Sequence, residues 1–231
     1  FQLLDLKKYF QLIAIDNRGI GNSEGFFEEL TIEDMAGDVD RLFSKLNIEQ
    51  VHLIGSSMGG MIALEYAAQN PEKIRSLVLS SLPILENLSF FEIFAGKLKL
   101  VLDEGDPKKL YQTMSSMNFS PAFLNDKRYE ILAGLFDRYP AAYPPKIISL
   151  QLNAIEEWRK LKNWAIEGCT CPCMIIFGSE DKFVPVKEAM GLMSKIFPHA
   201  IKKVIQGAGH AVHIEKPQEF NKIVCDFLWN H

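Results

Sequence analysis

Along the chain, short runs of apolar residues alternate with longer segments in which apolar and polar positions follow a helical period. Short apolar runs predict strands, and longer segments whose apolar residues recur every three or four positions predict helices between them. This alternation is typical of a mostly parallel sheet with helices on both of its faces, so the sequence predicts an α/β fold. The runs that we interpret as strands are residues 11–16, 51–56, 76–81, 173–178 and 201–207.

Helical periodicity is clear in several of the intervening segments. Residues 32–46 follow Thr31, a favourable N-cap residue, and carry apolar side chains at helical spacing. A second helix is expected over residues 58–70, since the proline that follows would end it. Two further helices are expected after Pro185 and from about Pro217, because proline is well accommodated in a first helical turn.

The alternation stops over residues 84–168, where helical segments are separated by proline-containing stretches. Because strand-like runs resume directly afterwards, we interpret these residues as a helical cap inserted into one core, which comprises residues 1–83 and 169–231. Large apolar side chains are frequent in the cap; most should hold it together, and some could line an apolar pocket. They are Phe90, Phe91, Phe94, Met114, Met117, Phe119, Phe123, Tyr139 and Trp158.

Composition and charge exclude several classes of partner. Of the 231 residues, 48% are hydrophobic and 23% are charged, as in ordinary globular proteins. The net charge of -4 argues against a nucleic-acid partner, because proteins that bind nucleic acid usually carry a basic surface. No apolar run reaches the roughly 18 residues of a membrane helix, and the first ten residues lack the layout of a signal peptide. We therefore expect a cytoplasmic protein without a membrane partner.

The cysteines do not indicate a metal site. Three of the four lie within residues 169–173, and the fourth, Cys225, lies in a predicted helix. Zinc sites usually have four ligands in pairs that are separated by two or more residues, a spacing that these cysteines lack. We expect free, partly buried thiols in a reducing compartment, and neither a metal nor another cofactor.

A strand followed by Gly-x-Ser-x-Gly and a helix is typical of a nucleophile elbow, in which a serine on a strained turn presents its oxygen above the sheet. Residues 55–59 fit this pattern, and the register makes Ser57 the central serine and Ser56 the variable residue. The helix start would aim backbone N–H groups at a reacting carbonyl oxygen, so we expect the N–H of Met58 to donate to an oxyanion. A glycine-rich turn without chemistry is the alternative interpretation.

The strained turn also explains why the segment is rich in glycine. Gly55 and Gly59 are expected to be required, because a side chain at either position would crowd the tight backbone. Gly60 is expected to let the helix approach the strand closely.

A serine nucleophile needs a histidine base, and the histidine needs a carboxylate that fixes its tautomer. The loop after the fourth predicted strand offers Glu180 and Asp181, and the loop after the fifth offers His210 and His213. His210 directly follows Gly-Ala-Gly, whereas His213 already approaches the last helix, so His210 is preferred. Asp181 is preferred over Glu180, in part because of the resemblance described next.

These motifs resemble those of the α/β-hydrolase superfamily, and the resemblance covers nearly the whole chain except the cap. It implies that Ser57 is the nucleophile, Asp181 the orienting acid and His210 the base. The residues of these motifs are most similar to those of the branch that contains enol-lactonases and small carboxylesterases. Haloalkane dehalogenases and epoxide hydrolases are similar but carry aspartate at the elbow. The motifs are DNRGIGNSE (16–24), GSSMGG (55–60), FGSEDKFVP (177–185) and GAGHAVHIEKPQEF (207–220).

One part of the family pattern is absent before Phe1. Family members begin with two antiparallel strands and a third strand whose His-Gly loop supplies a second oxyanion donor, and residues 1–10 look like the helix after that loop. The family sheet places the third strand between those that correspond to 11–16 and 51–56. We expect a truncated sequence; the alternatives are that 11–16 pairs with 51–56, or that another chain fills the gap.

The resemblance implies a serine hydrolase that cleaves a small carboxylic ester, lactone or related acyl substrate through an acyl-enzyme, without a cofactor. Two alternatives use the same scaffold. In one, the same three residues hydrolyse a carbon–carbon bond of a ring-cleavage product. In the other, the protein binds a ligand without turning it over.

Overall fold

A computed structural model of the chain describes residues 1–25, 28–84, 89–138, 144–160 and 170–231. Four strands in these residues pair in parallel, in the order β1-β2-β3-β4. They are β1 (Val51–Ser56), β2 (Ile74–Ser80), β3 (Cys173–Gly178) and β4 (Ile201–Ile205). The prediction of an α/β fold with a parallel sheet is therefore confirmed.

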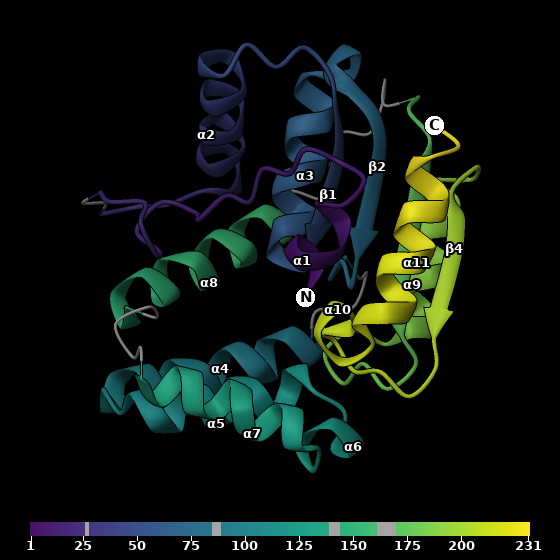
Figure 1. Cartoon of the computed structure of the whole chain (residues 1–231). Coiled ribbons are helices and arrows are strands. Elements are labelled where there is room, and N and C mark those ends of the chain that lie inside the picture. The colour runs from purple at the N-terminus through teal and green to yellow at the C-terminus, as the bar shows by residue number, and fades with distance from the viewer. Residues whose placement is uncertain (26–27, 85–88, 139–143, 161–169) are drawn as a thin grey trace.

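Helices precede, separate and follow these strands (Figure 1). In the core they are α1 (Gln2–Leu6), α2 (Ile32–Lys45), α3 (Met58–Gln69), the short 3-10 helix η1 (Pro71–Lys73), α9 (Val186–Ile196), α10 (Val212–Glu215) and α11 (Pro217–Leu228). Between β2 and β3 the chain forms α4 (Ser89–Glu104), α5 (Pro107–Asn118), α6 (Pro121–Leu124), α7 (Lys127–Arg138) and α8 (Pro145–Lys160). The limits of the cap at residues 84 and 168 stay a prediction.

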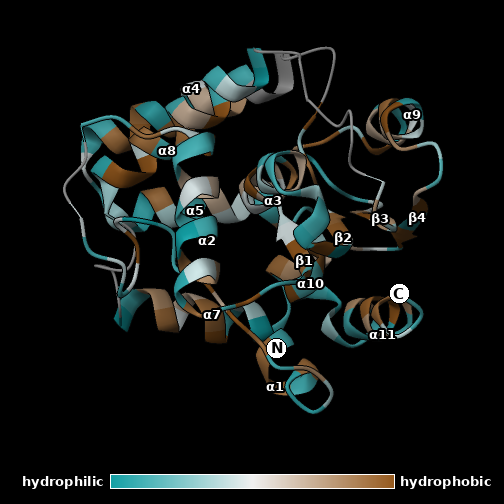
Figure 2. Cartoon of the chain, turned by 90° about the horizontal axis from the view of Figure 1, so that it is seen from above, coloured by the Kyte–Doolittle hydropathy of each residue, from teal (hydrophilic) through white to brown (hydrophobic). Residues whose placement is uncertain are grey.

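The two faces of the sheet bury separate apolar clusters, because successive side chains of a strand point to opposite faces. Leu77 and Leu79 of β2 pack with residues of α2, α3 and α9. Val78, between them, packs with Phe220 and Val224 of α11. Figure 2 shows α3 and α9 on one side of the strands and α11 on the other.

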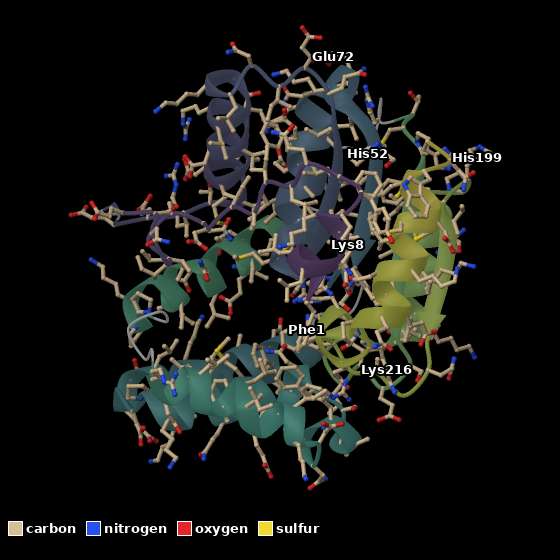
Figure 3. The ribbon with its side chains drawn as sticks, in the orientation of Figure 1. Phe1, Lys8, His52, Glu72, His199 and Lys216 are labelled. Carbon is tan, nitrogen blue, oxygen red and sulfur yellow. The ribbon has the colours of Figure 1, made fainter. Side chains whose placement is uncertain are left out.

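The carboxyl ends of the strands point toward the cap helices. In Figure 1 the arrowheads of β2 and β4 are directed at the layer formed by α4, α5 and α7. Glu72 and His199, which precede β2 and β4, lie at the opposite end of the sheet (Figure 3). Loops that leave the strands at their carboxyl ends therefore lie on the side of the sheet that faces the cap, where α/β folds usually bind ligands.

Helix α2 starts where the sequence predicts. The Thr31 hydroxyl accepts a hydrogen bond from the N–H of Asp34 at 2.9 Å, and the Asp34 carboxylate accepts one from the N–H of Thr31 at 3.1 Å. This reciprocal capping box satisfies backbone donors that the first turn leaves unpaired. Three more of the predicted helices form, as α3, α9 and α11.

The predicted strand at residues 11–16 is wrong, and its pairing with 51–56 does not occur. The segment is extended but unpaired, and its Ile13 and Ile15 are each 38% exposed. A short apolar run such as residues 12–15 predicts a strand, but it forms one only if a partner edge is within reach. Here the following turn is tied to α2, since Arg18 donates two hydrogen bonds to the Asp38 carboxylate, at 2.5 and 2.7 Å. In the described sheet β1 is consequently an edge strand.

Two features are absent from the described residues. No helix there is long and apolar enough to span a bilayer. No three His, Cys, Asp or Glu side chains gather there as metal ligands would. Cys169 lies outside the described residues, and the Cys225 thiol is buried, which raises its pKa.

Candidate active site

Ser57 occupies the turn between β1 and α3 in a strained backbone conformation, with φ of 54° and ψ of -121°. A residue with a side chain rarely adopts positive φ, and such strain is typical of functional turns. The turn is held from both sides. The N–H of Ser57 donates to the carbonyl of Ser80 in β2 at 2.9 Å, and the Ser57 carbonyl accepts from the N–H of Gly60 at 2.8 Å.

The glycines around the turn have different roles. A Cβ at Gly55 would lie 2.3 Å from the Gly59 carbonyl oxygen and 2.7 Å from the Cα of Gly60, so no side chain fits there. A Cβ at Gly60 would lie 3.0 Å from Leu82, which fits the expected close approach of α3. The expectation that Gly59 is required is wrong, because a Cβ there would meet no described atom within 4 Å.

The structure brings the three predicted residues into one chain of hydrogen bonds. His210 Nε2 lies 2.8 Å from Ser57 Oγ, and His210 Nδ1 lies 2.8 Å from Asp181 Oδ2. The side chains of His210 and Asp181 are 5% and 0% exposed. Solvent therefore does not compete for these bonds, and the geometry is that of a nucleophile, a base and an orienting acid.

Asp181, not Glu180, contacts the histidine. The other carboxylate oxygen of Asp181 accepts hydrogen bonds from the N–H groups of Phe183 at 2.8 Å and Val184 at 2.9 Å, which fix its orientation. Glu180 is exposed, and its N–H donates to the Ala208 carbonyl at 2.8 Å. Glu180 thus connects the loop after β3 to the loop after β4 through its backbone N–H, not through its side chain.

His213 lies on α10 and makes no hydrogen bond to Ser57. Burial, together with the nearby His210, lowers the pKa of His213 to about 4, so its imidazole is neutral at pH 7. His52 and His199 lie farther from the loops that carry Asp181 and His210, since Figure 3 shows both on the upper part of the molecule. His52 Nδ1 lies 2.8 Å from the Ser76 hydroxyl. Of these histidines, His210 alone is in contact with Ser57.

The two loops that carry the acid and the histidine are in close contact. A Cβ at Gly178, the last residue of β3, would lie 2.2 Å from the Gly209 carbonyl oxygen and 2.3 Å from that of Ala208. Only glycine therefore allows the histidine loop to cross the end of β3.

Two buried residues that support the histidine loop were not singled out from the sequence. The Ser81 hydroxyl donates to the His210 carbonyl at 2.7 Å, and Ser81 itself has a positive φ of 50°. The Glu215 carboxylate accepts from the N–H of Gly209 at 2.9 Å. The sequence gives no clear signal for Glu215, which is followed by Lys216 and looks like an ordinary exposed helix residue.

The N–H of Met58 is the first of helix α3 and lies beside Ser57. No residue in the described part of the chain accepts a hydrogen bond from it. The positive end of the helix dipole lies at the same place, and the role of this N–H as an oxyanion donor stays a prediction.

A cavity of about 360 Å³ opens beside Ser57 and His210. Its far wall comes mostly from the cap and includes Met114 and Phe119, two of the predicted candidates. Phe94, Phe123 and Trp158 are buried but do not line it, Met117 packs against the core, and the side chains of Phe90, Phe91 and Tyr139 lie outside the described residues. The remaining wall residues are Ser56, Leu110, Tyr111, Ser115, Asn118, Phe136, Ala211, His213 and Ile214.

A larger hollow of about 580 Å³ lies elsewhere, and Phe1 and Lys216, labelled in Figure 3, line it. Neither Ser57 nor His210 reaches it. Volume alone therefore does not identify the candidate site. Of these two cavities, the smaller one is lined by Ser57 and His210.

Comparison with known proteins gives a consistent result. Residues 2–217 match the family described as alpha/beta hydrolase fold. The monoacylglycerol lipase ABHD6 of Rattus norvegicus is 30% identical over 237 residues, which cover 96% of this chain and 68% of that protein. The 2-hydroxy-6-oxononadienedioate/2-hydroxy-6-oxononatrienedioate hydrolase of Cupriavidus pinatubonensis is 24% identical, over 96% of this chain and 77% of that protein. A thermophilic esterase from Thermogutta terrifontis superposes with a TM-score of 0.83 at 23% identity, covering 99% of this chain and 83% of the esterase.

Proposed function

The chain belongs to the α/β hydrolase family, and from this premise we propose that it is a serine hydrolase of small carboxylic esters, lactones or related acyl compounds. One observation carries the proposal: Ser57 Oγ, His210 and Asp181 are joined by two hydrogen bonds of 2.8 Å each. A protein that only binds a ligand does not need this arrangement, which therefore favours catalysis.

In the proposed reaction His210 Nε2 takes the proton of the Ser57 hydroxyl while Oγ attacks the acyl carbon. The Asp181 carboxylate accepts a hydrogen bond from the Nδ1–H group of His210 and stabilises the imidazolium that forms. The N–H of Met58 donates to the oxyanion of the tetrahedral intermediate. His210 then protonates the leaving group, and a water molecule, activated by the same imidazole, releases the acid from the acyl-enzyme. These steps require neither a metal nor an organic cofactor.

The lining of the cavity supports an uncharged, largely apolar acyl group. Leu110, Met114 and Phe136 contribute apolar surface, and none of the described lining residues is lysine or arginine. The similarity to a protein named monoacylglycerol lipase supports an ester bond as the target. A small acyl substrate is thus the expected partner, while the absence of nucleic-acid and membrane partners and a cytoplasmic location stay predictions.

Hydrolysis of a carbon–carbon bond is the second candidate, and the relative named for 2-hydroxy-6-oxo dienedioates favours it. By its name, that compound carries two carboxylates. Two carboxylates in a partly enclosed cavity would need cationic or strong hydrogen-bonding partners. The described wall offers hydrogen-bonding side chains, such as Tyr111 and Asn118, but no lysine or arginine to balance two negative charges, so the ester is the stronger candidate.

A fluorophosphonate probe tests the proposal, because it reacts with a serine only where a base activates it. We expect labelling of the peptide that contains Ser57, no labelling in Ser57→Ala, and weak labelling in His210→Ala. Ser56→Ala is the matched control and should label like the wild type. A folded protein that remains unlabelled would overturn the proposal of a serine hydrolase. Turnover of dienedioate substrates but not of p-nitrophenyl esters would favour the second candidate.

A further inference from the structure

Glu215 is a charged side chain in a buried position. It ends helix α10 and is 1% exposed. Burial raises the pKa of its carboxyl, and the hydrogen bonds from Ser120 and Gly209 oppose that rise. Since burying a carboxylate is unfavourable, its three specific donors need an explanation beyond packing.

The donors come from two different parts of the chain. Oε1 accepts from the N–H of Gly209 at 2.9 Å and from the N–H of Ser120 at 3.1 Å, and Oε2 accepts from the Ser120 hydroxyl at 2.5 Å. Gly209 directly precedes His210, and Ser120 is the N-cap of α6 in the cap. One carboxylate therefore joins the histidine loop to the cap.

Gly209 is enclosed at this junction. A Cβ on it would lie 2.7 Å from the Ser120 nitrogen and 2.8 Å from Glu215 Oε1. On the other side of the histidine, the N–H of Ala211 donates to the Asn118 carbonyl at 2.9 Å. The backbone is thus held on both sides of His210, and Glu215 provides the anchor on the side of Gly209.

We propose that Glu215 is a positioning residue for His210. Its carboxylate fixes the histidine loop against the cap, so that Nε2 stays within hydrogen-bond distance of Ser57 Oγ. The inference rests on the proposed function, because placement of the imidazole matters only if the imidazole transfers a proton. A displacement of about 1 Å at a catalytic group can lower a rate about 100-fold.

Three substitutions separate placement from charge. In Glu215→Gln the amide oxygen can accept from both N–H groups and the amide nitrogen can donate to the Ser120 hydroxyl, so we expect kcat within about threefold of wild type. Glu215→Asp keeps the charge but is one methylene shorter, and Glu215→Ala leaves the donors unpaired; for both we expect kcat to fall about 10- to 100-fold with little change in KM. Glu219→Gln, an exposed glutamate four residues later, is the matched control.

The assay is hydrolysis of a p-nitrophenyl ester, with the active sites counted by the burst of nitrophenol. A purely structural role would lower the number of active sites but leave kcat per active site unchanged. The inference is overturned if kcat per site in Glu215→Ala equals that of wild type, or if Gln is as damaging as Ala. Should Glu215→Ala not fold, the comparison of Gln with Asp decides, and Asp as active as Gln overturns it. Wild-type protein with neither burst nor fluorophosphonate labelling defeats the proposed function itself.

Discussion

Replacing Asp181 by asparagine tests the proposed mechanism most directly, because the surroundings of Asp181 dictate how the amide must lie. One carboxylate oxygen accepts from the N–H groups of Phe183 and Val184, at 2.8 and 2.9 Å. An amide nitrogen cannot accept hydrogen bonds, so the amide oxygen must take that place. The NH₂ group of the new side chain then faces His210 Nδ1, which lies 2.8 Å from the other carboxylate oxygen.

Two N–H donors cannot face each other, so His210 has to move its proton from Nδ1 to Nε2. In that tautomer Nε2 has no lone pair for the Ser57 proton. The expected fall in kcat is about 10⁴-fold, the size known for loss of the correct tautomer in a serine triad. This corresponds to a barrier about 5.5 kcal/mol higher. The fold should persist, since both backbone hydrogen bonds to the side chain are kept.

The measurement is turnover of a p-nitrophenyl ester by Asp181→Asn, together with its thermal unfolding. Glu180→Gln is the control, because Glu180 is exposed and uses only its backbone in the site. If Asp181→Asn keeps more than about a tenth of wild-type kcat, the reasoning on the tautomer is refuted. If Glu180→Gln loses activity instead, the orienting acid is assigned to the wrong residue.

Three further predictions concern the elbow, the cavity and pH. Gly55→Ala should lower the free energy of unfolding by more than about 3 kcal/mol, because its Cβ would lie 2.3 Å from the Gly59 carbonyl oxygen. Gly59→Ala should instead stabilise by about 0.5–1 kcal/mol, and urea unfolding compares the two. Met114→Trp should fill part of the cavity and raise KM for longer acyl esters while acetyl esters are hydrolysed as before. In the folded protein the pKa of His213 is lowered to about 4, so the imidazole binds a proton more tightly in the unfolded chain than in the folded one. The free energy of unfolding should therefore fall by roughly 3 kcal/mol as the pH drops from about 6.5 to 4. His213→Phe should remove that pH dependence of urea unfolding.

Much of the arrangement of this chain is predictable because it depends on local patterns. The apolar runs at 51–56 and 173–178 form strands with the predicted limits, and their parallel pairing carries the following loops to one end of the sheet. Residues as distant as Ser57 and His210 therefore meet without any direct sequence signal for their contact. The predicted strand at 11–16 does not form for the opposite reason, since a short apolar run does not specify which strand edge the segment reaches.

The glycines show a second limit of prediction from sequence patterns. Gly55 and Gly59 are equivalent in the motif, yet only the former has a backbone carbonyl where its Cβ would be. Glu215 shows a third: a charged residue on a helix is usually exposed, and its burial here depends on donors from Ser120 and Gly209, far apart in the chain. Tertiary contacts, not local propensity, determine both outcomes.

Strand β2 contributes none of the three proposed catalytic side chains, yet residues at its end bond to the backbone of two of them. The Ser80 carbonyl accepts from the N–H of Ser57, and the next residue, Ser81, donates its hydroxyl to the His210 carbonyl at 2.7 Å. The positive φ of Ser81, 50°, accompanies this arrangement, in which consecutive residues bond the elbow and the histidine loop. Because both bonds come from consecutive residues at one strand end, the proposed nucleophile and the proposed base are tied to the same piece of backbone. The 2.8 Å between Ser57 Oγ and His210 Nε2 thus depends on backbone contacts of β2 as well as on the loops that carry the two side chains.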